Sequence, residues 1–286
     1  MLSNKVREIM GTDLITSEAT CSVLEVMRLM VEKDVGRVVI TENQLPVGIF
    51  TERDVLRRVI GKDLDVNKVP ARKVMTAPIQ GVPQDTHIVE ALAKMYKEKF
   101  RHLLVLGGNG AIVGIVSMRR ILKLAVELGR GLTETRTVGS IMSRKVVTVE
   151  ATQSIAEVIA GMIKKHTVAT VVINKEVPVG IFTERDVLTR VAVKKVDRNR
   201  TPIKDVMTAK LISASHNAFI GEVLEKMYQG DFRNMPIRGE KGELVGIVSM
   251  DDVLKFARAL DIDESVRKSW KEIEAFWDSE DQYTPG

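Results

Sequence analysis

The chain of 286 residues has a single cysteine, Cys21, few aromatic residues and no long apolar run. One thiol cannot form an internal disulfide, so we expect a reducing compartment. No stretch of 18 or more apolar residues occurs, and no apolar signal core follows Met1. These absences predict a soluble cytoplasmic protein that makes no membrane contact.

Signatures of catalysis and of nucleic-acid binding are also missing. The segment Gly107–Gly110 is not followed by Gly-Lys-Ser/Thr, so it predicts a hairpin turn and not a phosphate-binding loop. The formal net charge of +5 fits an anionic ligand, but it is spread along the chain and forms no concentrated basic patch. We expect neither an enzyme nor a nucleic-acid partner. No metal-ligand spacing is found among the histidines, which are His87, His102, His166 and His216.

What the sequence does contain is an internal repeat. The segment Gly48–Asp54, Gly-Ile-Phe-Thr-Glu-Arg-Asp, returns 132 residues later as Gly180–Asp186. Two related segments, Gly114–Met118 and Gly246–Met250, lie midway, so the four glycines are 66 residues apart. The chain is therefore a duplication of a duplication. A methionine recurs once in each repeat, at Met10, Met75, Met142 and Met207.

The repeat spacing predicts domain boundaries at 1–65, 66–132, 133–197 and 198–260 for repeats one to four. The remaining residues, 261–286, form a C-terminal segment with a different pattern. Val266, Trp270, Ile273 and Trp277 fall on one face of a predicted helix. Two interpretations of this helix stay open, which are docking on the protein's own body and contact with a second subunit or effector.

Each repeat shows a β-α-β-β-α pattern, which predicts an α+β (α/β) fold. Ser22 and Glu25 form a capping-box pattern at the start of the first helix, and Ser154 and Glu157 repeat it. The β-branched run at residues 38–40 and the run at 47–50 predict a strand pair, and a last helix is expected from about Asp54 to Ile60. The apolar positions of the first helix are Val23, Val26, Met27, Met30 and Val31.

The Ile/Val-Met start, the helix, the hairpin and the motif Gly-hydrophobic-hydrophobic-Thr/Ser-x-x-Asp together resemble the CBS domain. Four copies in phase cover about residues 1–260. The resemblance implies that repeats one and two, and repeats three and four, pair into two Bateman modules. It further implies that AMP, ADP, ATP or S-adenosylmethionine binds in clefts between paired repeats. Such proteins usually regulate an attached enzyme or channel, so we expect a sensor without a catalytic cofactor, a homodimer and an effector protein that the sequence does not identify.

The motif ends have two interpretations. Thr51 with Asp54, and Thr183 with Asp186, can form capping boxes at helix starts. The free N–H groups of the same helix starts can also bind a phosphate, and the resemblance assigns ligand contacts to the matching Thr/Ser and Asp. The fourth repeat keeps Ser249 and Asp252. The second has Ser117 but Arg120, which only donates hydrogen bonds, so this site is either lost or altered to hold an additional phosphate.

Further ligand contacts are expected beside the motifs. The basic residues near the motifs are candidates for phosphate pairing, because arginine makes bidentate contacts with phosphate. They are Arg53, Arg185, Arg58, Arg190, Arg101, His102, Arg233 and Arg37, of which Arg101 and Arg233 are favoured because they occupy equivalent places just before a strand. The segment that leads into the first strand of each repeat is expected in the core, and by resemblance it holds the adenine. The residues of these leading segments that we assign to the ligand are Ile15, Thr16, Ile79, Val147, Thr148 and Ile212.

Two other functions remain as alternatives. The chain could be a scaffold or oligomerisation module that needs no ligand. A dehydrogenase that carries CBS repeats, of the inosine monophosphate type, would also show these motifs, but the repeats leave no room for a catalytic barrel. Whether the two modules meet within one chain or between two chains stays open.

Overall fold

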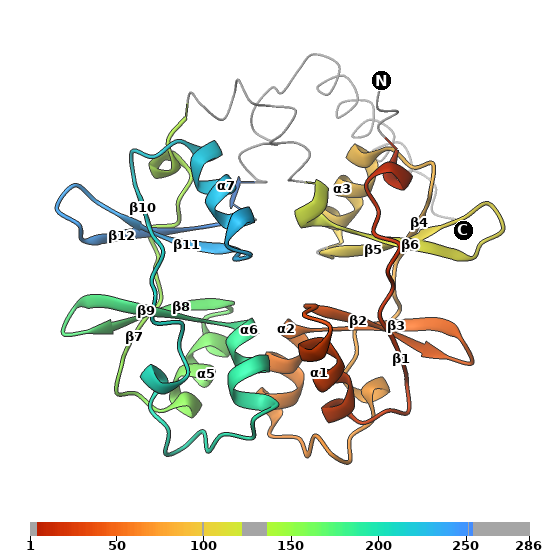
Figure 1. Ribbon diagram of the computed structural model, residues 1–286, viewed down its shortest axis with the longest axis horizontal. Coiled ribbons are helices and arrows are strands. Elements are labelled where there is room, and N and C mark those ends of the chain that lie inside the picture. The colour runs from red at the N-terminus through yellow and green to blue at the C-terminus, as the bar shows by residue number, and fades with distance from the viewer. Residues whose placement is uncertain (1–4, 99, 122–135, 251, 254–286) are drawn as a thin grey trace, which may run out of the picture.

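The computed structural model describes residues 5–98, 100–121, 136–250 and 252–253. In this part of the chain, four three-stranded sheets are arranged in one layer around the centre of a disc (Figure 1). Repeats one and two form one half of the disc and repeats three and four form the other. The helices of repeats one and three meet between the halves. The expected α+β fold is therefore confirmed.

In the described residues, all four repeats share the order strand, helix, strand, strand. The first contains β1 (Thr16–Glu18), α1 (Val23–Glu32), β2 (Arg37–Glu42), β3 (Leu45–Thr51) and α2 (Glu52–Asp54), which continues as the π-helix η2 (Val55–Val59) and the 3₁₀ turn η3 (Ile60–Lys62). The second contains β4 (Gly81–Pro83), α3 (Ile88–Lys97), β5 (His102–Leu106) and β6 (Ile112–Ser117). The third contains β7 (Thr148–Glu150), α5 (Ile155–Lys164), β8 (Ala169–Asn174), β9 (Val177–Thr183), α6 (Glu184–Asp186) and η6 (Val187–Ala192). The fourth contains β10 (Ala214–Ser215), α7 (Ile220–Gln229), β11 (Asn234–Arg238) and β12 (Leu244–Ser249).

Short 3₁₀ turns precede each first strand. They are η1 (Val6–Glu8), η4 (Ala71–Lys73), η5 (Val138–Ser140) and η7 (Ile203–Asp205). The first strand of each sheet pairs parallel with the second, and the second and third strands form an antiparallel hairpin. The bounds of the strands and α-helices of the third repeat are those of the first shifted by 132 residues, and the strand register is shifted equally.

The local signals of the sequence form as expected. Ser22 accepts a hydrogen bond from the Glu25 N–H, and the Glu25 carboxylate accepts from the Ser22 N–H at 2.8 Å, so the capping box is present. Ser154 and Glu157 form the same box. The hairpin between β5 and β6 turns at Gly110, whose φ of +77° lies in the left-handed region that favours glycine.

The repeated glycines and methionines contact one another across paired repeats. A Cβ added at Gly48 would lie 2.4 Å from the Met75 sulfur, and one at Gly180 would lie 2.5 Å from the Met207 sulfur. Gly114 and Gly246 stand in the same relation to the methionines of the repeats that precede them, Met10 and Met142. A larger side chain would push the leading segment of the paired repeat away. The glycine and the methionine that recur in every repeat are thus in contact with each other, each glycine with the methionine of the paired repeat.

The two modules meet within this one chain. The largest apolar cluster joins α1 and η2 of repeat one with α5 and η6 of repeat three, and its fully buried side chains include Met27, Leu56, Met162 and Leu188. Because apolar residues at helical spacing lie on one face of each helix, these faces pack against each other and form one shared core between the halves. The predicted tail helix, with Trp270 and Trp277, lies outside the described residues.

Candidate functional site

In the Thr-Glu-Arg-Asp motif of repeat three, Thr183 and Asp186 form a hydrogen-bonded helix start. The Asp186 Oδ2 atom accepts hydrogen bonds from the Thr183 N–H at 2.9 Å and the Thr183 hydroxyl at 2.7 Å. Its Oδ1 atom accepts from the Thr208 hydroxyl at 3.1 Å and lies 3.3 Å from the Arg190 Nε atom. Arg190 also donates to the Val206 carbonyl at 3.2 Å, which ties the site to repeat four.

The same geometry recurs elsewhere in the disc. In repeat one, Asp54 accepts from Thr51 and, at 3.0 Å, from the Thr76 hydroxyl. In repeat four, the Asp252 Oδ2 atom accepts from the Ser249 hydroxyl at 2.6 Å. The capping-box interpretation is confirmed at all three motifs, and each leaves a buried or half-buried carboxylate at a helix start. Such a carboxylate can accept further hydrogen bonds from a ligand hydroxyl.

Burial dominates the electrostatics of these carboxylates. Asp54 and Asp186 are 4% and 6% exposed. Removal from water raises the pKa of both, while the threonine hydrogen bonds and the nearby arginines, Arg58 and Arg190, act in the opposite direction. The neighbouring groups offset the loss of water around these carboxylates only in part. A ligand hydroxyl that donated a hydrogen bond to them would offset it further.

Repeat two departs from this pattern on both sides of its cleft. The Arg120 N–H donates to the Ser117 hydroxyl at 3.3 Å, but the Arg120 side chain is exposed. Opposite β6, Gly11 bridges to Ile115, whereas Ser143 bridges to Ile247 at the equivalent place in the other module. Arg120 therefore replaces the aspartate of the other sites, and Gly11 replaces the hydroxyl-bearing residue that Ser143 provides in the other module.

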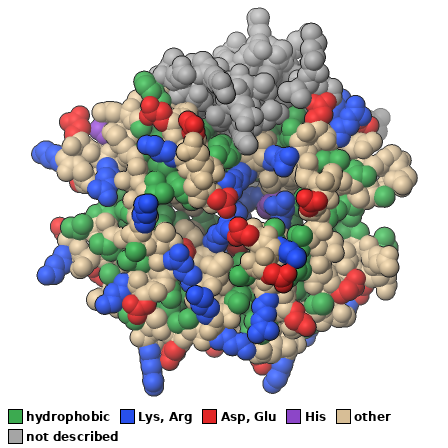
Figure 2. Space-filling model, viewed as in Figure 1, with side chains coloured by type: hydrophobic (Ala, Val, Ile, Leu, Met, Phe, Trp, Pro, Cys, Tyr) green, Lys and Arg blue, Asp and Glu red, His purple; other side chains and the backbone are tan. Residues whose placement is uncertain are grey.

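A cavity of about 1020 Å³ lies in the second module and continues to the centre of the disc. This volume is at the upper end of the range of about 300–1,000 Å³ that is typical of ligand pockets. Figure 2 shows Lys, Arg, Asp and Glu side chains gathered at the centre of one face. The predicted site residues that line the cavity are Arg37, Arg53, Arg101, His102, Ser117, Val147, Thr183, Arg185, Asp186, Arg190, Ile212, Arg233, Ser249 and Asp252.

Other predicted site residues do not line this cavity. Thr16 and Thr148 are exposed on the first strands of their sheets, and Arg120 is exposed in the helical segment after β6. The remaining ones are Thr51, Asp54, Ile15 and Ile79, all in the first module. Among them, Ile79 packs against an apolar cluster and Ile15 packs against the shared core.

That apolar cluster makes the two modules differ. In the first module, Ile49 and Ile115 are 8% and 3% exposed and pack with Val39 and Leu104. The equivalent isoleucines of the second module, Ile181 and Ile247, are half-buried and line the cavity. Pro236 stands where the first module has Leu104, so less apolar volume fills the second cleft.

A comparison with protein families fits this geometry. The family model described as the CBS domain matches residues 6–61, 71–127, 138–193 and 203–259. The chain belongs to the CBS domain family. Its four CBS domains form two Bateman modules, as the sequence predicted.

Relatives and solved structures extend the match over most of the chain. The CBS domain-containing protein CBSCBSPB1 of Arabidopsis thaliana is 28% identical over 292 residues, which covers 89% of this chain and 54% of that protein. The chain thus spans about half the length of the first curated relatives that it matches. A protein of Methanocaldococcus jannaschii, described as a candidate archaeal homologue of γ-AMPK, has a TM-score of 0.73 at 17% identity and covers 88% of this chain and 99% of its own. An uncharacterized protein of Pyrococcus horikoshii has a TM-score of 0.60 at 19% identity, with coverage of 88% and 99%. These two structures show the same fold.

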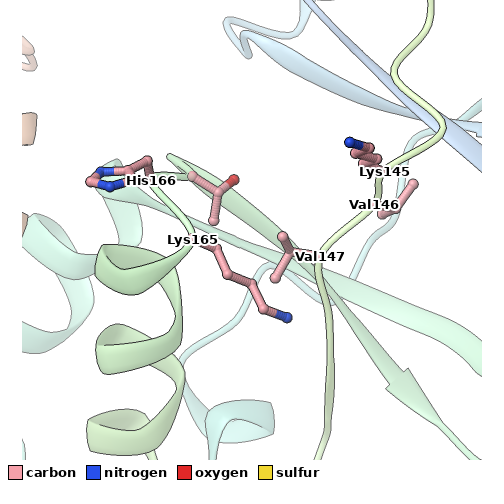
Figure 3. Close-up of a pocket in the computed structure, with 6 residues that line it drawn as sticks. Lys145, Val146, Val147, Lys165 and His166 are labelled. Carbon is pink, nitrogen blue, oxygen red and sulfur yellow. The ribbon is translucent and has the colours of Figure 1, made fainter.

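The outer rim of the second CBS module is cationic. A pocket of about 540 Å³ lies beside the large cavity, and Figure 3 shows Lys145 and Val147 of the leading segment facing the turn that carries Lys165 and His166. The first module has Asp13 and Asp34 at the positions of Lys145 and His166. This rim of the second module therefore carries more positive charge than the same part of the first module.

Sequence reasoning missed several residues at the cavity. Glu52 and Glu184 line it and are 4% and 5% exposed, although the repeated Thr-Glu-Arg-Asp motif contained them. Thr208 is a further one, and the repeat of Met-Thr at residues 75–76 and 207–208 was the signal that could have found it.

Neither a metal site nor a membrane span is found in the described part of the chain. There, no three His, Cys, Asp or Glu side chains are grouped so that they could hold a metal ion. Likewise, none of the helices in these residues combines the length and apolar character needed to cross a bilayer.

Proposed function

We propose that this CBS protein is a regulatory sensor that binds an adenosine nucleotide in the cleft of its second Bateman module. The observation that carries the proposal is the contrast between the modules. In the second module, Asp186 and Asp252 both line a large open cavity. In the first module, Ile49 and Ile115 belong to a buried apolar cluster that fills the equivalent place.

The lining fits the parts of a nucleotide. Asp186 and Asp252 supply acceptors for ribose hydroxyls. Val147 and Ile212 supply apolar surface for a base. The part of the cavity wall that carries Arg53, Arg101 and Arg233, here called the cationic wall, suits phosphate groups. Because the sulfonium of S-adenosylmethionine is itself positive, the charge of the wall favours AMP, ADP or ATP.

Matched aspartates test this proposal. Isothermal calorimetry with AMP, ADP, ATP and S-adenosylmethionine should show binding of a phosphate-bearing nucleotide to the natural protein. Asp186→Asn should weaken it by about tenfold or more, since an unpaired buried group costs about 1–3 kcal/mol. Asp54→Asn makes the same change at the same place in the first module and should leave the affinity unchanged.

The outcome can overturn the proposal in two ways. If the natural protein binds none of these compounds, a ligand-independent scaffold is the better description. If Asp54→Asn alone abolishes binding, the ligand lies in the first module.

The output of the sensor is a further part of the proposal. The first curated relatives that the chain matches are about twice as long, so we expect an effector, whether a partner protein or an additional domain, to respond to the ligand. A homodimer and a cytoplasmic location stay predictions. Sedimentation at several concentrations with and without ADP will measure the oligomeric state.

A further inference from the structure

Two buried glutamates are the unexpected feature of the cavity wall. Glu52 and Glu184 are the first residues of α2 and α6 and are almost fully buried. A glutamate is seldom buried unless an opposite charge compensates it. Burial raises the pKa of Glu184, Arg101 and Arg53 act in the opposite direction, and Glu52 adds to the rise. The two carboxylates therefore need their arginine neighbours.

These neighbours come from the opposite Bateman module. Arg233 of repeat four donates to the Glu52 Oε2 atom at 3.2 Å. In the related arrangement, Arg101 NH1 of repeat two lies 3.8 Å from Glu184 Oε2, and Arg53 Nε of repeat one lies 3.5 Å from Glu184 Oε1. Within the described residues, neither Arg53 Nε nor Glu184 Oε1 forms a hydrogen bond although both atoms are buried. The Glu184 pairs with Arg53 and Arg101 are thus charge contacts that a better acceptor could replace.

The centre carries more positive than negative charge. Arg37 lies on the same wall, and among the residues that the structure describes no carboxylate is within ion-pairing distance of it. Burial lowers the pKa of Arg37, and the charges of Arg233 and Arg120 lower it further. At the equivalent place the third repeat has Ala169. Arg37, Arg53, Arg101 and Arg233 thus lie on the wall that holds the two buried glutamates, and Arg185 beside them pairs with Asp34 and Asp231. The excess of guanidinium groups over buried glutamates favours an incoming anion.

We infer that Glu52 and Glu184 occupy the guanidinium groups that a ligand phosphate requires, and that binding exchanges Glu–Arg pairs for phosphate–Arg pairs. This inference rests on the proposed function, because it concerns how that cavity takes its ligand. A phosphate offers arginine bidentate contacts in place of the long contacts around Glu184. Release of Arg233 from Glu52 removes a tie between the two modules, whereas Arg53 and Arg101 would be tied to the second module through the ligand instead of through Glu184. The exchange therefore couples binding to the contact between the modules.

The test measures binding of inorganic tripolyphosphate and of ADP to the full chain by calorimetry. Glu184→Gln removes the competing charge while keeping the size of the side chain. It should tighten tripolyphosphate binding by about tenfold or more, the scale of one charge-assisted hydrogen bond. Glu176→Gln makes the same charge change at an exposed turn of the same repeat and should alter binding less than about twofold. A purely structural role of Glu184 predicts weaker binding and not tighter binding.

Glu52→Gln provides a second route if Glu184→Gln does not fold, which circular dichroism will show. It should also tighten binding, because it frees Arg233. If the natural protein binds neither probe, the proposed function itself fails. If it binds both, and the Glu52 and Glu184 variants match Glu176→Gln, the nucleotide site stands and the exchange is wrong.

Discussion

The contact between Gly180 and the leading segment of repeat four can be tested by adding one methyl group. In Gly180→Ala the new Cβ would lie 2.5 Å from the Met207 sulfur and 2.8 Å from the Thr208 carbonyl oxygen. The side chain of Met207 can turn, but the Thr208 carbonyl accepts the Ile181 N–H at 3.0 Å and cannot move alone. The leading segment must therefore shift as a unit.

The expected magnitude follows from this overlap. Forcing an extra carbon into a packed contact costs about 1–3 kcal/mol. A chain of this size loses about 2–4 °C of melting temperature for each kcal/mol. The Thr208 hydroxyl also donates to Asp186 at 3.1 Å. A displaced segment should thus lower ligand affinity as well as stability.

Gly161→Ala is the matched control. Gly161 lies within α5, and a Cβ there would meet no heavy atom within 4 Å. Replacing a helical glycine by alanine should raise stability by about 0.5–1 kcal/mol. Urea unfolding followed by circular dichroism measures both variants. An unchanged midpoint for Gly180→Ala would refute the idea that glycine is required there because Met207 packs on it.

Three further predictions concern charge and capping. Burial, with Arg37, Arg233, Arg101 and Arg53 nearby, holds the pKa of His102 well below its ordinary value, so the folded chain keeps this ring neutral while the unfolded chain gains a proton below about pH 6.5. Stability should therefore fall as pH drops from 7.5 to 5.5, by up to about 1.4 kcal/mol from His102. His102→Asn, which introduces the residue of repeat four, should reduce that fall in urea unfolding; an equal fall in both proteins would contradict the assignment. Arg190→Gln should destabilise by about 1–3 kcal/mol, because Asp186 and the Val206 carbonyl lose a donor, whereas Arg200→Gln, at a side chain that is 90% exposed, should change the melting temperature little. Ser154→Ala should cost about 1 kcal/mol through loss of the capping box, and a change near zero in urea unfolding would show that the box is not needed for α5.

Much of the fold was predictable because its signals are local and repeated. Ser22 and Glu25 are three residues apart, so their capping box could be identified before any packing was known. The spacing of Gly48 and Gly180 gave the four repeats, and the motif ends gave Asp54, Asp186 and Asp252 as carboxylates at helix starts. Each of these features depends on neighbours in the chain, which the sequence displays directly.

The difference between the modules was only half visible. Arg120 in place of an aspartate marked repeat two as unusual. The clustering of Ile49 with Ile115, and the half-exposed state of Ile181, depend on how two sheets close on each other. The same isoleucine occurs in both modules, so residue type by itself could not distinguish a filled cleft from an open one.

By itself, then, the sequence determined the repeat, the elements within it and the residue types at each helix start, since helix and strand periods and caps act over a few residues. Only the tertiary structure decided that the modules meet within one chain and that Glu52 lies against Arg233. These two residues are 181 positions apart. From its local sequence, Glu52 is predicted as an exposed charge at a helix start, and Arg233 as an exposed charge at a strand start. The charges became a site because folding removed both from water and placed them on one wall, where a buried carboxylate requires an opposite charge.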